Sequence, residues 1–363
     1  MKTLNVTLKD RRYPIQVGAG ALAGAGAFLR KQGFKSAPVV VSNPTVMRLH
    51  GKALLASLEG AFGKTPVIKI GDGERFKSHE TLLGIYGKMF ELRASRGSWI
   101  LAFGGGVVGD IAGFAAATFM RGIPYAMAPT TLLSQVDSSI GGKTAVNVPQ
   151  GKNLVGAFYQ PSAVLADTEV LKTLPKRELA SGLYEVVKYG AICSKGLLGY
   201  LEKHLGAILA CGARELEHVV LESARIKADV VALDERETGL RTILNYGHTV
   251  GHAFEAATHY RKFKHGEGVA WGMVAALRYG REVGLLDEED AGRLVRIIHG
   301  VGKLPPVRNI PFDDVWSALM RDKKFQAGDI RMVLLKGLGE AAIYNGLERE
   351  PLRDFLRRFL KES

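Results

Sequence analysis

The sequence predicts two domains, an N-terminal α/β domain followed by a C-terminal helical domain. The chain has 363 residues, and a typical domain holds about 150. In the first half, short apolar runs rich in β-branched residues end in Gly or Asn, and a helical pattern follows each run, which is typical of buried parallel strands. From about residue 174 long helical patterns replace this alternation. We therefore divide the chain into domains 1–170 and 171–363.

The strands expected in the first domain end at residues suited to turns. Residues 38–41 read Pro-Val-Val-Val and lead into Ser-Asn-Pro, whereas residues 99–103 lead into three glycines. Residues 111–119 after those glycines have a helical pattern, and the apolar segment 123–129 ends at two threonines. This alternation predicts a parallel sheet with crossover helices.

The second domain is expected to be entirely helical. Residues 178–189, 215–233 and 268–283 have helical patterns. In the final segment, five apolar residues at helical spacing form one stripe of a capping helix: Leu352, Phe355, Leu356, Phe359 and Leu360.

Composition and charge exclude several classes of protein. Lys and Arg number 49 against 36 Asp and Glu, a net charge of +13 that fits either ordinary surface charge or an anionic small molecule. The basic residues are scattered and form no nucleic-acid-binding motif. No apolar stretch approaches the roughly 20 residues of a membrane span, and the N-terminus does not resemble a signal peptide. Two cysteines cannot build a disulfide framework, so we expect a cytoplasmic protein that binds neither nucleic acid nor membrane.

Two glycine-rich segments are candidates for binding phosphate. Residues 104–110 read Gly-Gly-Gly-Val-Val-Gly-Asp between a predicted strand and a helix, where backbone N–H groups can approach a pyrophosphate, although a tight packing turn would look the same. Residues 141–144 read Gly-Gly-Lys-Thr, but Asp137 stands where a P-loop needs glycine, which disfavours an NTPase. Lys143, Lys152 and Asn153 would more simply hold an anionic substrate or cofactor.

Histidines in the second domain are candidates for binding a metal. His248 and His252 lie four residues apart on one helical face with Glu255, and His265 precedes the next helix. Thr249 follows the first histidine where a zinc metalloprotease needs Glu, so that class is disfavoured.

Glu185 and Lys188, one helical turn apart, are candidates for a further group at this centre. Three protein ligands with one open position are the arrangement of a catalytic metal, because a closed shell leaves no room for substrate.

These motifs, taken in order along the chain, resemble those of the 3-dehydroquinate synthase family. The resemblance covers most of the chain and rests on residues 71–77, 104–110, 129–147, 151–161, 185–190, 234–237, 241–249, 265–267 and 322–324.

The resemblance implies a Rossmann-like NAD-binding domain, an all-helical metal-binding domain, an active site in the cleft between them, and a homodimer. It implies that 3-deoxy-D-arabino-heptulosonate 7-phosphate is cyclised to 3-dehydroquinate with loss of phosphate, the second step of the shikimate pathway to aromatic amino acids. NAD would oxidise the substrate, phosphate would leave, hydride would return, and an aldol reaction would close the ring. Zn²⁺ or Co²⁺ would act as a Lewis acid.

The resemblance also assigns roles to residues. The metal ligands would be Glu185, His248 and His265. NAD would bind at Asp72, Glu74, Lys77, Gly106, Val107, Val108, Gly109, Asp110, Thr130, Thr131, Lys152, Leu171, Lys172 and Thr173. The catalytic set would be Glu237 and His252, which match proton-transfer positions, together with Lys143, Lys188, Arg241 and Asn245. Further substrate contacts would be Asp137, Asn153, Lys227, Lys323 or Lys324, and Arg121 reaching across the dimer.

One departure from the family pattern concerns the adenosine ribose. Where the family commonly has Asp and Asn, this chain has Asn43 and Thr45. The missing carboxylate predicts weaker NAD binding and weaker selection against NADP.

Three alternative functions remain open. A related sugar-phosphate cyclase, forming a 2-deoxy-scyllo-inosose or valienone-type ring, would share the metal ligands. Lys143, Asn153, Lys188, Arg241 and Asn245 together favour a substrate that carries a carboxylate. A metal-dependent polyol dehydrogenase would release NADH, and a basic nucleic-acid-binding protein would bind DNA in a steeply salt-dependent manner.

Overall fold

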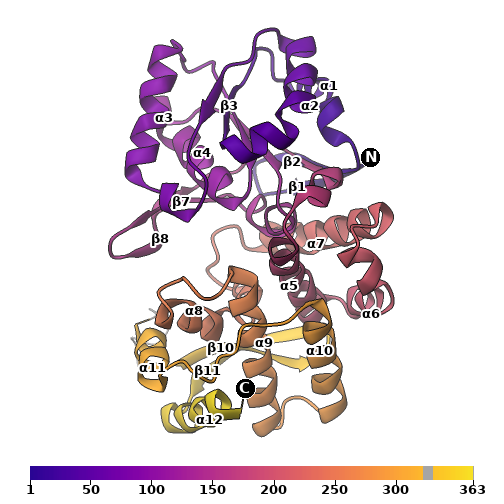
Figure 1. Cartoon of the computed structure of the whole chain (residues 1–363), viewed down its shortest axis with the longest axis vertical. Coiled ribbons are helices and arrows are strands. Elements are labelled where there is room, and N and C mark those ends of the chain that lie inside the picture. The colour runs from indigo at the N-terminus through magenta and orange to yellow at the C-terminus, as the bar shows by residue number, and fades with distance from the viewer. Residues whose placement is uncertain (322–329, 363) are drawn as a thin grey trace. The chain divides into compact units, whose positions relative to one another are not determined.

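The chain forms two compact units. The computed structural model describes residues 1–321 and 330–362. The first unit comprises Met1–Pro175 and Cys211–Arg236, and the second comprises Lys176–Ala210 and Glu237–Ser363. Helix α7 (Ala213–Leu233), which a division at residue 170 assigns to the second domain, lies in the first unit because it packs against the first two strands (Figure 1).

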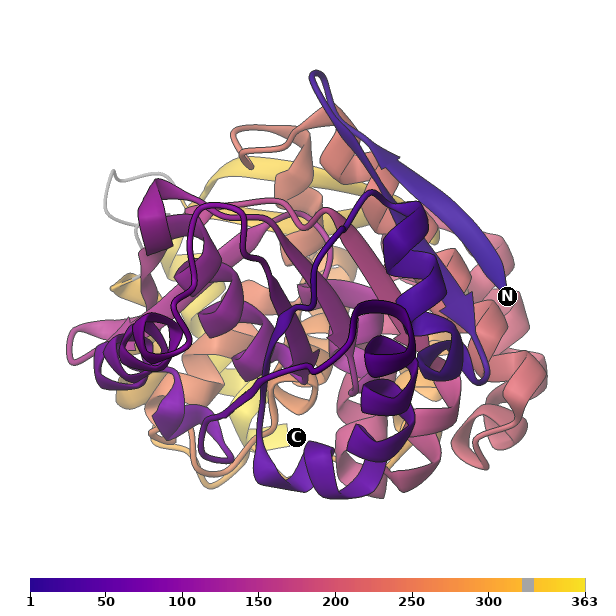
Figure 2. The same cartoon turned by 90° about the horizontal axis from the view of Figure 1, so that it is seen from above.

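A seven-stranded sheet forms the centre of the first unit. Its spatial order is β1 (Lys2–Thr7), β2 (Arg12–Gly18), β9 (Ala163–Asp167), β6 (Tyr125–Pro129), β5 (Ile100–Gly104), β3 (Val39–Ser42) and β4 (Val67–Lys69). All neighbouring pairs are parallel except β1–β2, a long ribbon at one edge that Figure 2 shows clearly. Strands β3 and β5 are fully buried, which confirms the strands predicted from their apolar runs.

The direction in which successive strands are added to the sheet changes in the middle of the sheet. Helix α2 (Pro44–Phe62) connects β3 to β4, α3 (His79–Glu91) connects β4 to β5, and α4 (Gly106–Thr118) connects β5 to β6. Helix α1 (Ala25–Lys31) packs with α2, and α3 packs with α4. Along the chain, β4 is added on one side of β3, whereas β5, β6 and β9 are added on the other. Open α/β sheets bind ligands beyond the carboxyl ends of the strands at such a switch point, which here lies between β3 and β5.

Short elements follow the carboxyl ends of the strands. They are η1 (Ala21–Gly24), η2 (Glu74–Phe76), the π-helical turn η4 (Ser134–Ser138) and η5 (Thr168–Thr173), whereas η3 (Phe119–Arg121) follows helix α4 and precedes β6. A separate antiparallel hairpin, β7 (Lys143–Val148) with β8 (Gly151–Phe158), lies against α3 and α4. The sequence did not predict this hairpin.

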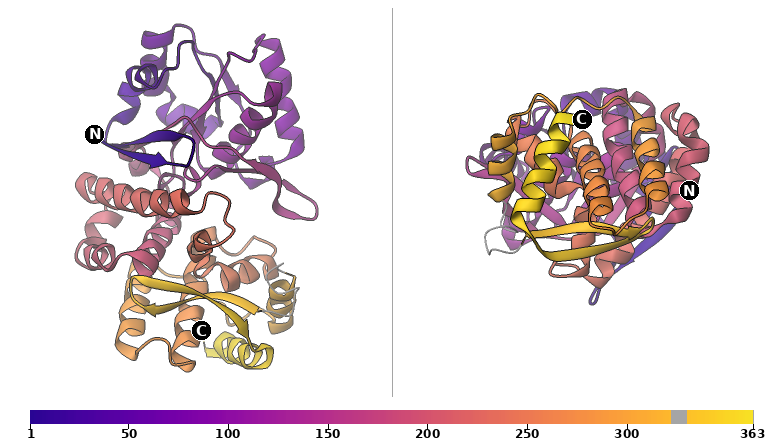
Figure 3. Two further views of the ribbon diagram at one scale, coloured as in Figure 1. Left: turned by 180° about the vertical axis from the view of Figure 1, so that it is seen from behind. Right: turned by 90° about the horizontal axis from the view of Figure 1, so that it is seen from below.

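The second unit is mainly helical, as predicted. Its helices are α5 (Lys176–Cys193), α6 (Lys195–Leu209), η6 (Leu240–Asn245), α8 (His248–Ala257), α9 (His265–Glu282), α10 (Glu288–Val301), α11 (Phe312–Met320) and α12 (Arg349–Glu362). The prediction of an all-helical domain missed one feature, the antiparallel pair β10 (Ile330–Gly337) and β11 (Glu340–Leu347), which packs against α5 and α9 (Figure 3). The apolar stripe predicted for the last helix is buried: Leu352, Phe355, Leu356, Phe359 and Leu360.

Among residues 1–321 and 330–362, no helix combines the length and the hydropathy needed to cross a membrane.

Candidate active site

Glycines allow helices α8 and α9 to cross at very short range. A Cβ atom on Gly272 would lie 1.7 Å from the carbonyl oxygen of Gly247, and one on Gly251 would lie 2.6 Å from that of Gly268. Because both contacts are with backbone, no larger residue fits at either position without moving a helix. This close approach brings the histidines of α8 next to the start of α9.

The first turn of α9 is fixed to α5. Gly266 donates its backbone N–H to Ser181 Oγ at 3.0 Å, and a Cβ atom on Gly266 would lie 1.9 Å from the Ser181 carbonyl oxygen. Glu267 binds Arg177 with both oxygens, at 2.6 and 2.7 Å, and accepts the Lys264 backbone N–H at 2.8 Å. The run His-Gly-Glu at 265–267 thus places His265 directly before two residues that position the helix.

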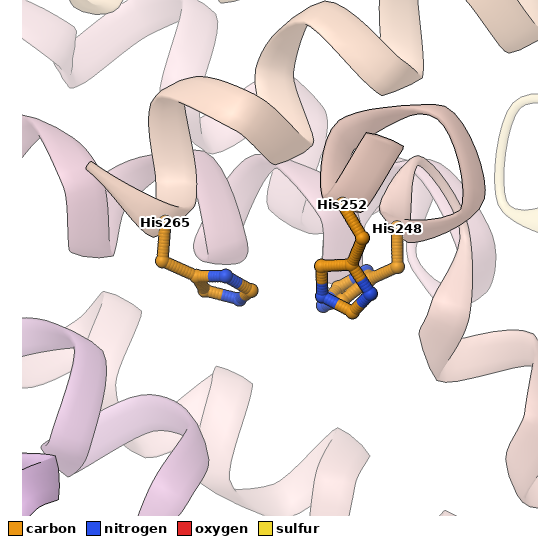
Figure 4. A group of neighbouring side chains, drawn as sticks. All are labelled: His248, His252 and His265. Carbon is orange, nitrogen blue, oxygen red and sulfur yellow. The ribbon is translucent and has the colours of Figure 1, made fainter. Parts of the chain in front are cut away.

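Three histidine rings converge at this crossing (Figure 4). Ligand atoms of His248, His252 and His265 lie within 4.8 Å of one another. Glu185 on α5 completes the group, because its Oε1 lies 3.6 Å from His248 Nε2 and 3.5 Å from His265 Nε2. His252 is the solvent-exposed member, whereas Glu185 is fully buried.

Hydrogen bonds orient two of these rings. His248 Nδ1 lies 3.2 Å from the Tyr246 carbonyl oxygen, and His265 Nδ1 lies 3.0 Å from Glu255 Oε1. A carbonyl oxygen only accepts, so Nδ1 of His248 carries the proton, and Nε2 of both rings faces Glu185.

The two rings differ in pKa. Burial and the charge of Lys188 lower the pKa of His248 well below its usual value, so this ring is neutral at pH 7. Burial acts in the same direction on His265, but hydrogen bonds to Glu185 and Glu255 outweigh it and raise its pKa to about 10. A ring held by two carboxylates is a strong site for a cation, either a proton or a metal ion.

Other predicted catalytic residues lie around the same helix. Lys188 forms a buried ion pair with Glu185 one turn away on α5. Element η6 packs against α5 and carries Arg241, whose side chain is 1% exposed. Asn245 at its end donates to Glu237 Oε1 at 2.7 Å, and Glu237 has a left-handed backbone with φ of 58°. Such strain in a non-glycine residue is typical of functional sites.

In the first unit, one buried lysine joins two predicted binding segments. The Lys77 ammonium donates to Asp110 on α4 and to Asn153 Oδ1 on β8. Burial raises the pKa of Asp110, and the charge and hydrogen bond of Lys77 oppose that rise. The predicted cofactor residues Lys77 and Asp110 and the predicted substrate residue Asn153 are therefore neighbours.

The polar loop before α3 makes further contacts within the first unit. Thr45 donates to Asp72 Oδ2 at 3.2 Å, and Glu74 accepts from Asn147 at 2.8 Å with Lys152 at 4.0 Å. Asn43, the residue expected at the ribose, caps α2 by accepting the Val46 N–H at 2.8 Å. Its side chain therefore has a structural role that the sequence alone did not indicate.

The glycine run after β5 begins helix α4 earlier than the sequence predicted, at Gly106 rather than Ile111. Gly105 offers no side chain to cap this helix. A Cβ atom on Gly105 would lie 3.0 Å from Thr131, and one on Gly106 would lie 3.2 Å from Ser138 Oγ. The first N–H groups of α4 are thus bordered by hydroxyl groups. The predicted cofactor residues of this run, Gly106, Val107, Val108, Gly109 and Asp110, all lie in its first two turns.

The remaining predicted residues of the first unit occupy separate positions. Lys227 on α7 binds Asp137 in the π-helical turn, with Nζ 2.6 Å from Oδ1. Arg121 is exposed in a turn with φ of 67°. Lys143 is exposed at the start of β7. Lys172 pairs with Glu169 on the surface.

The other predicted cofactor residues lie beyond β6 and β9. They are Thr130, Thr131, Leu171 and Thr173. Leu171 is fully buried, and Thr173 shares a hydrogen bond of 2.8 Å with His50. Lys323 and Lys324 lie outside the described residues.

Sequence reasoning assigned no role to two residues of these clusters. Asn147 links Glu74 to the Asn153 backbone, which donates to Asn147 Oδ1 at 3.0 Å. It lies on β7, a strand that the sequence did not predict. Glu255 was noted only as sharing a face with the histidines, and its contact with His265 depends on the crossing of α8 and α9.

Known protein families match most of this chain. Residues 67–181 match the 3-dehydroquinate synthase N-terminal family and residues 182–325 match the 3-dehydroquinate synthase C-terminal family. A protein named 3-dehydroquinate synthase from Pelotomaculum thermopropionicum is 47% identical over 98% of this chain and 96% of its own length.

Two solved structures share the whole fold. One is 2-deoxy-scyllo-inosose synthase complexed with carbaglucose-6-phosphate, NAD⁺ and Co²⁺, with a TM-score of 0.89, 28% identity and full coverage of both chains. The other is 2-epi-5-epi-valiolone synthase from Streptomyces hygroscopicus with NAD⁺ and Zn²⁺ bound, with a TM-score of 0.87, 27% identity, and coverage of 98% of this chain and 99% of that one. The resemblance predicted from the motifs is confirmed: this chain belongs to the 3-dehydroquinate synthase family.

Proposed function

We propose that the protein cyclises 3-deoxy-D-arabino-heptulosonate 7-phosphate to 3-dehydroquinate with loss of phosphate, using bound NAD and a divalent metal. The reaction is assigned on the ground of family membership. The observation in this chain that supports metal-dependent chemistry is the group formed by one buried glutamate and three converging histidines.

The second unit supplies residues that fit a catalytic metal. Glu185, His248 and His265 offer one oxygen and two Nε2 atoms, the donor set that Zn²⁺ and Co²⁺ accept. When bound, the metal would polarise the reacting hydroxyl and lower its pKa. His252 is exposed at the edge of the group, so we assign it to proton transfer and not to the metal.

The first unit supplies residues that fit NAD. The uncapped start of α4 presents N–H groups and a positive helix end to the pyrophosphate. Lys77 and the two threonines follow the carboxyl ends of β4 and β6, and Lys152 lies on β8, 4.0 Å from Glu74. When bound, NAD would take a hydride from the substrate and return it, so that no net oxidation occurs.

Cationic residues would hold the two anionic ends of the substrate. Lys188 and Arg241 are buried near the proposed metal ligands, and Asn245 is held by Glu237. Lys143, Asn153 and Lys227 would bind from the first unit. A guanidinium can bind a carboxylate with two hydrogen bonds, which fixes the reacting conformer.

The test is a turnover assay with the heptulosonate phosphate, NAD below stoichiometric amounts, and Zn²⁺ or Co²⁺. We expect release of one phosphate per product of the correct mass, without accumulation of NADH, and loss of turnover on chelation that either metal reverses. NADH forming in step with product would instead indicate a polyol dehydrogenase. Faster turnover of a sugar phosphate lacking the carboxylate would indicate another cyclase.

We also propose a homodimer that acts in the cytoplasm. Large apolar side chains are exposed on α3 (Leu83, 65%; Phe90, 61%) and on β8 (Leu154, 57%; Phe158, 47%), and exposed apolar patches favour association. Phe90 packs on Phe119 in the η3 turn that also holds Arg121, with ring centroids 5.2 Å apart. Light scattering tests the dimer. Mixing inactive Arg121→Ala and His248→Ala proteins should restore partial activity if Arg121 serves the partner subunit.

A further inference from the structure

Glu255 is a buried carboxylate that the proposed chemistry does not use. It lies on α8 and is 6% exposed. Its Oε1 lies 3.0 Å from Nδ1 of His265, on the side of the ring opposite Nε2. The neighbouring helix leaves room for it, because a Cβ atom on Gly268 would lie 2.9 Å from this oxygen. The fold therefore buries two carboxylates, Glu185 and Glu255, next to one proposed metal ligand, His265.

The two proposed histidine ligands differ in the group behind them. His248 faces a neutral carbonyl oxygen at 3.2 Å, whereas His265 faces a carboxylate at the shorter distance of 3.0 Å. A carboxylate that accepts the Nδ1 proton fixes the tautomer, orients the ring and makes Nε2 a stronger electron donor.

We propose that Glu255 is a positioning residue that fixes His265 as the Nδ1–H tautomer and strengthens its Nε2 as a metal ligand. This inference rests on the proposed metal site. It assigns to Glu255 no contact with substrate. Its effect is on metal affinity, and any effect on turnover follows from that.

The experiment measures binding of Co²⁺ alone by competition with a chelator, on the full chain prepared without metal. Glu255→Gln keeps the size and an accepting oxygen but removes the charge, and Glu255→Ala removes both. We expect each variant to bind Co²⁺ about 10- to 100-fold more weakly than the wild type. Glu282→Gln, at the exposed far end of α9 where Glu282 pairs with Arg358, is the matched control and should bind like the wild type.

A purely structural role gives a different result. It predicts a lower melting temperature of the metal-free variants with unchanged Co²⁺ affinity, which would overturn the proposal. A measurement on the wild type needs no variant: ¹⁵N NMR of the Zn²⁺-loaded protein should show His265 protonated at Nδ1. Metal bound through Nδ1 would also overturn it.

The test separates this inference from the proposed function. If the wild type binds one Co²⁺ and turns over substrate while both Glu255 variants bind equally well, only the role of Glu255 fails. If the wild type binds no Co²⁺, the metal site fails and this inference fails with it.

Discussion

Replacing Gly266 by alanine tests how the first turn of α9 places His265. The added Cβ atom would lie 1.9 Å from the Ser181 carbonyl oxygen, and real Cβ contacts are essentially never shorter than 3.0 Å. Since both sides are backbone, α9 and α5 must separate by about 1.1 Å at this point. The hydrogen bond from Gly266 N–H to Ser181 would stretch from 3.0 Å beyond its useful range.

Two effects of different size should follow. Overpacking typically costs about 1–3 kcal/mol and a lost hydrogen bond about 1 kcal/mol more, so we expect a loss of roughly 2–4 kcal/mol. At about 2–4 °C per kcal/mol, the melting temperature should fall by roughly 5–15 °C. A metal site tolerates only about 0.2 Å in its ligand distances, so Zn²⁺ affinity should fall by more than about 100-fold.

Gly280→Ala is the control on the same helix, because no atom lies within 4 Å of its added Cβ. It should leave metal affinity unchanged and raise stability by about 0.5–1 kcal/mol, the gain expected for alanine over glycine inside a helix. Thermal unfolding and chelator competition on both variants decide the matter. A Gly266→Ala protein that melts and binds Zn²⁺ like the wild type would show that the contact with Ser181 does not position His265.

Four further substitutions test other parts of the proposal. His248→Ala should no longer bind one metal ion per chain, which elemental analysis would show. His252→Ala should keep the metal but lose turnover, which an assay of phosphate release would show. Lys77→Met leaves Asp110 without its counter-charge and should destabilise the protein by on the order of 2 kcal/mol, since the pair is only partly buried. Because burial raises the pKa of Asp110 in the folded state, the unfolding free energy of this variant should fall as pH rises above about 4, and a flat pH profile would contradict it. Arg241→Lys keeps the charge but loses the two-pronged hydrogen bond, so kcat/KM should fall ten- to several-hundred-fold with metal content intact. Lower stability with normal kinetics would make Arg241 a structural residue instead.

Local patterns predicted the elements that carry the first-unit site. Strand β5 and the glycine run after it were recognisable because a buried parallel strand is continuously apolar and its turn needs glycine. The structure begins α4 inside that run at Gly106, whereas the helical pattern was read only from Ile111. Glycine has a low intrinsic helix propensity, so the local sequence does not explain why α4 starts at Gly106. The start is fixed instead by the packing of β5 and the Thr131 loop.

Contacts between distant segments explain what the sequence could not predict. The β10–β11 pair has a recognisable signature, a β-rich run ending near Gly337 and Gly339, but long helical patterns on both sides favoured a helical reading. Helix α7 has an apolar face that fits either unit, and no local signal says that it packs on β1 and β2.

The histidine site was predictable in part. The spacing of His248 and His252 places both on one face of a helix, and the sequence says no more than that. Their meeting with His265 and Glu185 depends on Gly251, Gly268 and Gly272, whose missing side chains let two backbones come together. Only the structure shows that these glycines face one another.

The burial of charge in the second unit points to function and not to stability. Glu185, Lys188 and Arg241 are each at most 1% exposed. Taking such ions out of water costs several kcal/mol each, and a buried ion pair is often no better for stability than apolar residues of the same volume. Folding alone would favour leucine or methionine at these positions. A protein that must hold a dication and two anionic groups of a substrate needs those charges where water is excluded, because there each interaction is strongest. We therefore propose that the chemistry takes place around these buried charges of the second unit.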